Sequence, residues 1–330
     1  MSIGMSLAAL IGGLVLLIGG GELLVRGAVR IAERAGVSAA LVGTVIVGFG
    51  TSLPELAASL DAVLAGSPGI AWGNIAGSNI ANSLLILGAA ALLYPIATRD
   101  FSAWRDPLIA VAATAVLWLV SLDATPAPWV GFVLIAGIAS YVYWSYVLER
   151  GGSPASATSG PHSRAEALEM ADTHIHAPLN GYARPVLLLV AGLVLLVAGA
   201  HLLVGGAVDI ARIAGMSETV IGLTVVAVGT SLPELVTSAV AALRKQGAIA
   251  LGNILGSNIY NILAIGGVVL VAAPSSIPNG FAGFEMPILA GLAVLMWIVI
   301  ALRAPIGRAA GAACLAAYAA YIAYSLTPYL

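Results

Sequence analysis

Long apolar runs alternate with short polar segments along almost the whole chain. Roughly 20 apolar residues are enough for a helix to cross a bilayer, and a helix pairs its own backbone groups there. We therefore predict ten membrane-spanning helices, at about 4–25, 39–64, 71–94, 107–121, 128–148, 184–207, 217–242, 248–272, 285–302 and 308–326. The fold class predicted is all-α, a polytopic membrane protein.

One polar segment, residues 149–183, interrupts the series and contains a Gly-Gly-Ser-Pro stretch typical of a linker. It divides the chain into residues 1–148 and 184–330, with five predicted spans in each half. The basic residues assign a side to the loops. Of the 13 Lys and Arg residues, 12 fall near loops on one side, beginning with Arg26, Arg30 and Arg34 after the first span. The positive-inside rule then predicts that the linker is cytoplasmic and that both ends of the chain lie on the outer side of the cell membrane.

Two sequence words recur at one spacing. Residues 50–56, Gly-Thr-Ser-Leu-Pro-Glu-Leu, return unchanged at 229–235, and residues 73–82 return with two changes at 252–261, in both cases 179 residues later. The repeats cover about 39–94 and 217–272. Because each half has an odd number of spans, the second half enters the membrane from the opposite side. Inverted five-helix repeats are typical of secondary transporters, whose substrate site lies between the repeats.

The repeated words carry two acidic residues, Glu55 and Glu234, deep in predicted spans. A carboxylate inside a membrane is costly and normally faces a cavity or a partner. No Lys or Arg lies at a matching depth, so we expect a cation or a proton as the partner. The alternative is a protonated glutamate that only holds helices together.

Small polar residues accompany each glutamate at a spacing of four, which places them on one helical face. Taken one at a time, such residues often serve only to join membrane helices. Together they predict four oxygen-rich faces around one centre: Thr51, Glu55 and Ser59; Thr230, Glu234 and Ser238; Ser78 and Asn82; Ser257 and Asn261.

Pro54 and Pro233 precede the two glutamates. Proline lacks an N–H and clashes with the carbonyl four residues earlier, here that of Gly50 or Gly229. Both helices are therefore predicted to break, leaving backbone oxygens near the carboxylates. Oxygen ligands without imidazole or thiolate suit Ca²⁺ and Na⁺.

Composition excludes several classes of protein. Hydrophobic residues make up 60% of the chain and charged residues 8%, against about 25% charged in soluble domains. Nucleic-acid binding is therefore not expected. The single cysteine excludes an internal disulfide framework. We find no nucleophile–base pair or cofactor motif, so we expect neither an enzyme nor a cofactor.

With these residues in view, the sequence resembles the cation/Ca²⁺ exchanger superfamily, and within it the prokaryotic Na⁺/Ca²⁺ exchangers. The resemblance implies ion ligands at Thr51, Ser52, Glu55, Ser78 and Asn82, and at their mates Thr230, Ser231, Glu234, Ser257 and Asn261. It also implies backbone oxygens near Gly48 and Ala227. Several relatives carry Asp where this chain has Asn261, which argues against K⁺ co-transport and removes one proton acceptor.

The predicted function is a Na⁺/Ca²⁺ antiporter that works by alternating access and exports Ca²⁺ electrogenically. Its expected partners are Ca²⁺, Na⁺ and the lipid bilayer, with no obligate protein partner. The glycine runs at Gly19–Gly21 and Gly205-Gly206 suggest that the first and sixth spans slide as a gate. A Ca²⁺/H⁺ or other divalent antiporter, and a cation channel, remain as alternatives.

Overall fold

The computed structural model describes residues 3–99, 101, 105–123, 125–151, 181–214, 227–272, 277–278 and 280–326. These residues are nearly all helical, and Ile96 and Ile306 form an isolated antiparallel bridge. The first half comprises α1 (Ile3–Ala35), α2 (Ala39–Leu41), the π-helical segment η1 (Val42–Val47), α3 (Gly48–Thr51), α4 (Leu53–Leu64), α5 (Pro68–Ala81), the π-helical segment η2 (Asn82–Ile86), α6 (Leu87–Leu93), α7 (Asp106–Ser121) and α8 (Pro128–Gly151). The second half comprises α10 (Ala183–Ile213), α12 (Ala227–Thr230), α13 (Leu232–Leu243), α14 (Gly247–Tyr260), the π-helical segment η4 (Asn261–Ile265), α15 (Gly266–Ala272), α16 (Glu285–Ala301) and α17 (Arg308–Leu326).

The predicted all-α membrane fold is confirmed, and the described helices fit the predicted layout of ten spans in two repeats. Within the described residues, five helices are long and apolar enough to cross a membrane unbroken, and the bent segment 39–64 would make a sixth. The helices α7 and α16 are shorter but apolar. Residues 217–226 of the seventh predicted span and 152–180 of the predicted linker lie outside the described residues.

Two predicted helix ends are wrong. Helix α1 continues to Ala35 and α10 to Ile213, so Arg26, Arg30 and Arg34 lie on a helix and not in a loop. These arginines recur every four residues, which gathers them on one face and lets the helix run on beyond the apolar stretch. Arg26 also pairs with Glu22 one turn earlier at 2.5 Å, an arrangement that supports an exposed helix.

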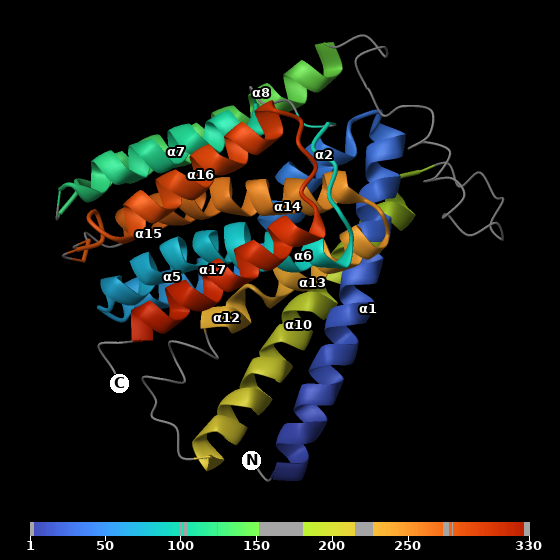
Figure 1. The fold of residues 1–330 in the computed structure, drawn as a ribbon, viewed down its shortest axis with the longest axis horizontal. Coiled ribbons are helices and arrows are strands. Elements are labelled where there is room, and N and C mark those ends of the chain that lie inside the picture. The colour runs from blue at the N-terminus through green and yellow to red at the C-terminus, as the bar shows by residue number, and fades with distance from the viewer. Residues whose placement is uncertain are drawn as a thin grey trace.

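Helices α1 and α10 run side by side, steeply inclined to the other helices (Figure 1). Their backbones touch at glycines. A Cβ added to Gly13 would lie 2.7 Å from the carbonyl oxygen of Gly199, and one added to Gly20 would lie 2.8 Å from that of Gly192. The contacting glycines of the two helices are equivalent positions of the repeat, because Gly192 and Gly199 stand 179 residues after Gly13 and Gly20. Within the predicted glycine runs, Gly19 and Gly205 face open space.

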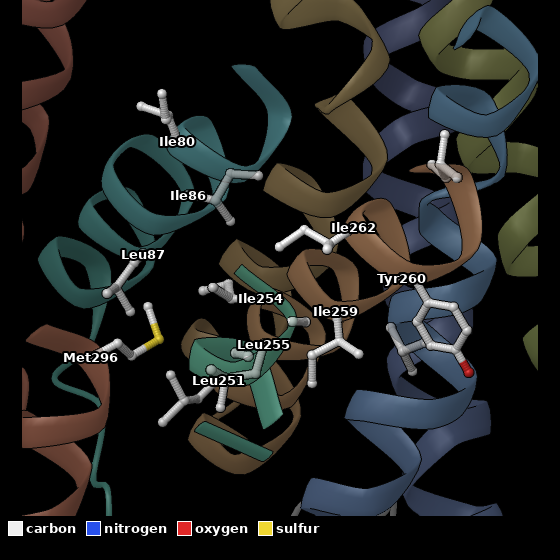
Figure 2. Close-up of a cluster of buried hydrophobic side chains, with 14 of the residues drawn as sticks. Ile80, Ile86, Leu87, Leu251, Ile254, Leu255, Ile259, Tyr260, Ile262 and Met296 are labelled. Carbon is white, nitrogen blue, oxygen red and sulfur yellow. The ribbon is translucent and has the colours of Figure 1, made fainter. Parts of the chain in front are cut away.

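The remaining helices also pair by the repeat. Helix α7 packs on its own equivalent α16, while the contact of α6 with α17 is mirrored by that of α15 with α8. The core between the halves follows the same rule. Figure 2 shows Ile80 and Ile86 from the α5–η2 span together with Ile254, Leu255 and Ile259 from α14. Ile80 and Ile259 are equivalent residues, and both side chains are fully buried.

Several basic residues gather at one end of the α1–α10 pair. Arg244, just after α13, forms an ion pair with Glu22 of α1, and Arg34 donates a hydrogen bond to the carbonyl of Gly181. Tyr182, which precedes α10, in turn donates to the Arg34 carbonyl at 3.1 Å. Contacts therefore join Arg34 of α1 to the residues before α10, and Arg244 after α13 to Glu22 of α1.

Candidate functional site

Both helices that carry the repeated glutamates break, as the prolines predict. In the first half the helix stops after Thr51, and α4 starts at Leu53 with a bend of 40°. In the second half α12 ends at Thr230 and α13 starts at Leu232. Pro54 and Pro233 occupy the first turns of α4 and α13, where no N–H is needed. Glu55 and Glu234 then stand in the first turn of a half-helix, at the positive end of its dipole.

The two carboxylates are buried and bound across the halves. Each glutamate is 1% exposed. The hydroxyl of Ser231, at the break of the second half, donates to Glu55 Oε1 at 3.0 Å. The hydroxyl of Ser52, at the break of the first half, donates to Glu234 Oε1 at 3.0 Å. The two carboxylates thus meet the interface between the repeats from opposite sides.

Neither carboxylate has a basic partner among the described residues. The ion pairs found there involve Glu22, Asp106 and Asp209. A buried, unpaired carboxylate is expensive to maintain. The site therefore requires a compensating positive charge that the described side chains do not supply.

Six buried side-chain oxygens have no hydrogen-bond partner in the described structure, and four of them belong to the repeated words: Glu55 Oε2, Glu234 Oε2, Asn82 Oδ1 and Asn261 Oδ1. These four form two pairs related by the repeat. An unsatisfied buried acceptor costs about 1–3 kcal/mol, and more if it is charged. A bound cation would satisfy all four, because carboxylate and amide oxygens are the ligands that hard cations prefer.

The serines of the second word adjoin the same carboxylates. Ser257 Oγ lies 3.3 Å from the Gly48 carbonyl and 3.5 Å from Glu234 Oε1. This approach is possible because Gly48 packs directly against the backbone of α14. Ser78 Oγ lies 3.4 Å from Ser231 Oγ. Both serines therefore belong to the cluster of side-chain and backbone oxygens around Glu55 and Glu234.

The threonines join the cluster through asparagines of the opposite half. Thr51 donates to Asn253 Oδ1 at 3.0 Å, and Thr230 to Asn74 Oδ1 at 3.5 Å. Ala227 begins α12, one helical turn before Ser231. Its place in the site rests on its equivalence to Gly48. The contacts above thus connect nine of the twelve predicted site residues, while Asn82 and Asn261 are assigned to the site by their buried, unpartnered oxygens.

Two residues of the site were not predicted from the sequence. Asn74 donates to the Glu55 carbonyl at 3.1 Å and to Ser59 Oγ at 2.8 Å. Its mate Asn253 makes the equivalent bonds to the Glu234 carbonyl and Ser238 Oγ, at 3.3 and 3.0 Å. These asparagines therefore brace the glutamate helices. Their presence in both copies of the second word was the available signal.

The bracing also involves two residues of the predicted oxygen-rich faces. Ser59 and Ser238 share a helical face with the glutamates, and this pattern predicts that they line the ion centre. Their hydroxyls accept hydrogen bonds from Asn74 and Asn253. The structure thus gives both serines a part in bracing the glutamate helices.

Comparisons with known proteins agree with this geometry. A family model described as sodium/calcium exchanger protein matches residues 5–147 and 184–327. The sodium/calcium exchanger MaX1 of Methanosarcina acetivorans is 31% identical over 94% of this chain and 95% of that protein. The putative antiporter CaxA of Alkalimonas amylolytica is 36% identical over 88% of each chain. Among solved structures, the sodium-calcium exchanger NCX_Mj soaked with Na⁺ and Sr²⁺ matches with a TM-score of 0.81 and 31% identity, over 97% of this chain and 98% of that one.

Proposed function

The chain belongs to the sodium/calcium exchanger family, and on that premise we propose that it exchanges Na⁺ for Ca²⁺ across a membrane by alternating access. One observation supports this most strongly. Two buried carboxylates and two buried amides of the repeated words leave four oxygens without a partner, and no described basic side chain pairs with the carboxylates. Such a site attracts small cations and offers nothing to an anion or an organic substrate.

We assign twelve residues to the ion site. Glu55 and Glu234 supply charge, and the hydroxyls, amides and backbone carbonyls complete the coordination. The full set is Thr51, Ser52, Glu55, Ser78, Asn82 and Gly48 from the first half, and Thr230, Ser231, Glu234, Ser257, Asn261 and Ala227 from the second.

The site chemistry explains why the two ions alternate. Two ionised carboxylates balance one Ca²⁺, or several Na⁺ ions at neighbouring positions. Because both ions need the same carboxylates, one leaves as the other binds. Ser52 and Ser231 each donate a hydrogen bond to the glutamate of the other half. Ion binding at either carboxylate should therefore affect the contacts of both half-helices.

We further propose that the exchange expels Ca²⁺ and moves net positive charge inward. If one surplus charge crosses per cycle, a membrane potential adds about 2.3 kcal/mol per 100 mV to the driving force. The proposed location is the cell membrane, with the 149–183 linker in the cytoplasm and both ends of the chain outside. The basic residues support this orientation, since 12 of 13 fall near the proposed cytoplasmic side. We propose that one chain in lipid suffices, without an obligate protein partner.

Flux in proteoliposomes tests the proposed function. Liposomes loaded with Na⁺ and diluted into Na⁺-free buffer should accumulate ⁴⁵Ca²⁺, and a pH or K⁺ gradient alone should not drive uptake. Uptake driven by the pH gradient would instead favour a Ca²⁺/H⁺ antiporter. Passive Ca²⁺ flux that does not depend on any counter-ion would favour a channel.

Two substitutions tie this flux to the site. Glu55→Gln keeps the shape of the side chain but removes its charge, and should abolish uptake. Glu285→Gln is the matched control, because Glu285 also begins a membrane helix but lies outside the cluster. Exchange that survives Glu55→Gln would contradict the assignment.

A further inference from the structure

An asparagine ligand has two ends, and only one of them binds a cation. Asn82 and Asn261 each present an oxygen, which is an acceptor, and an NH₂ group, which is a donor. If the NH₂ group faced the ion, its partial positive charge would oppose binding. The orientation of these two amides is therefore as important as their presence.

Each amide is held by an asparagine of the opposite half. Asn82 Nδ2 donates to Asn258 Oδ1 at 3.0 Å, and Asn261 Nδ2 donates to Asn79 Oδ1 at 3.1 Å. Asn79 and Asn258 stand 179 residues apart, so the repeat preserves the arrangement. With both NH₂ groups engaged, the oxygens of Asn82 and Asn261 are left as the unpartnered atoms.

The holding asparagines are themselves fixed. Asn258 Nδ2 donates to Ser83 Oγ at 3.1 Å, and Asn79 Nδ2 donates to the Asn258 backbone carbonyl at 3.4 Å. If Asn258 turned over, its NH₂ group would meet that of Asn82, and two donors would face each other without an acceptor. Asn79 is anchored by a backbone carbonyl, which can only accept, so its chain of hydrogen bonds permits one orientation of Asn261. The chain through Asn258 gives Asn82 the same orientation when the Ser83 hydroxyl accepts, as it does in the structure.

We propose that Asn79 and Asn258 are positioning residues, which turn the amide oxygens of Asn261 and Asn82 toward the cation. This inference rests on the proposed function. It assigns a role in ion affinity to two residues that touch the ligand asparagines. It also makes each half of the protein responsible for a ligand of the other half.

A crossed rescue distinguishes this role from simple packing. Asn79→Leu and Asn258→Leu keep the side-chain size and remove the acceptor. Leucine is preferable to alanine here, since both asparagines already line a cavity of about 20 Å³. Each substitution should raise the Ca²⁺ Kd of the purified protein about tenfold, or about 1.4 kcal/mol, measured by ⁴⁵Ca²⁺ equilibrium binding.

Aspartate has oxygen at both ends, so it needs no orientation. The Ca²⁺ Kd of the double variant Asn79→Leu with Asn261→Asp should therefore lie within about threefold of the Kd of the Asn261→Asp single variant. The same Asn261→Asp substitution should not restore the Ca²⁺ affinity that Asn258→Leu lowers. Asn82→Asp should do the reverse. A non-specific effect of added charge would appear equally in both backgrounds.

The outcomes separate the two proposals. A wild-type protein that binds no Ca²⁺ would overturn the proposed function and this inference with it. Wild-type binding with unchanged affinity in both leucine variants, or rescue of both by either aspartate, would overturn this inference alone. The Asn79–Asn261 contact and the Asn258–Asn82 contact share no side chain. If one leucine variant fails to fold, the other variant therefore still tests the inference.

Discussion

Helices α1 and α10 should tolerate a methyl group at one glycine and reject it at the next. Gly19 and Gly20 are neighbours in α1, yet a Cβ on Gly19 meets nothing within 4 Å. A Cβ on Gly20 would lie 2.8 Å from both Gly192 O and Leu196 N, which are backbone atoms that cannot turn aside. Gly20→Ala must therefore push the two helices apart.

The expected sizes follow from these contacts. Replacing a helical glycine by alanine gains about 0.5–1 kcal/mol in helix propensity, and Gly19→Ala should keep that gain. Overpacking costs about 1–3 kcal/mol, so Gly20→Ala should be destabilising on balance, by up to about 2.5 kcal/mol.

Thermal unfolding in detergent measures the difference, with Na⁺-driven ⁴⁵Ca²⁺ uptake as the functional readout. The midpoint should rise slightly or stay unchanged for Gly19→Ala and should fall for Gly20→Ala. Uptake should fall only in the second variant if α1 and α10 work as a closely packed pair. Equal behaviour of the two alanine variants would refute the close contact.

Three further predictions concern the site and its supports. Ser52→Ala should weaken Ca²⁺ binding about tenfold or more, because hydrogen bonds to charged groups contribute about 1.5–3 kcal/mol, and a double-mutant cycle should couple it to Glu234→Gln more strongly than to Glu55→Gln. Asn253→Leu should lower both the thermal midpoint and Ca²⁺ affinity, since it removes the hydrogen bonds that Asn253 makes to the Thr51 hydroxyl, the Glu234 carbonyl and Ser238 Oγ. A midpoint equal to that of wild type would argue against the brace. Tyr141→Phe removes a 2.9 Å hydrogen bond to the buried side chain of Asp106. It should lower the free energy of unfolding by about 1–3 kcal/mol and leave the Ca²⁺ Kd unchanged. A changed Kd would place Tyr141 and Asp106 closer to the ion path than we infer.

The sequence was sufficient to predict the architecture because it carries the same words twice. The repeated Gly-Thr-Ser-Leu-Pro-Glu-Leu word located the broken helices, and an odd number of spans in each half set their opposite directions. Pro54 and Pro233 indicated the breaks because their effect on a helix is local. Other local rules also gave most helix ends to within three residues.

Features that depend on the meeting of the halves could not be predicted. No spacing shows that Ser231 binds Glu55 while Ser52 binds Glu234, because the two partners come from different repeats. The same holds for Asn74 and Asn253, whose partners become visible only when the helices are packed. The ends of α1 and α10 are predicted too early for another reason. Charged residues lower the hydropathy of a segment, so the pattern predicts a helix that ends with the apolar run, although a helix can extend beyond the membrane.

The central claim is that Glu55 and Glu234 together hold the transported cation. Crystals of the protein soaked in Sr²⁺ or Ca²⁺ and measured for anomalous scattering test it most directly. We expect a peak between the two carboxylates, with Glu55 Oε2 and Glu234 Oε2 at about 2.3–2.6 Å from a bound Ca²⁺. A peak elsewhere, with these two oxygens hydrogen-bonded to protein groups, would contradict the account.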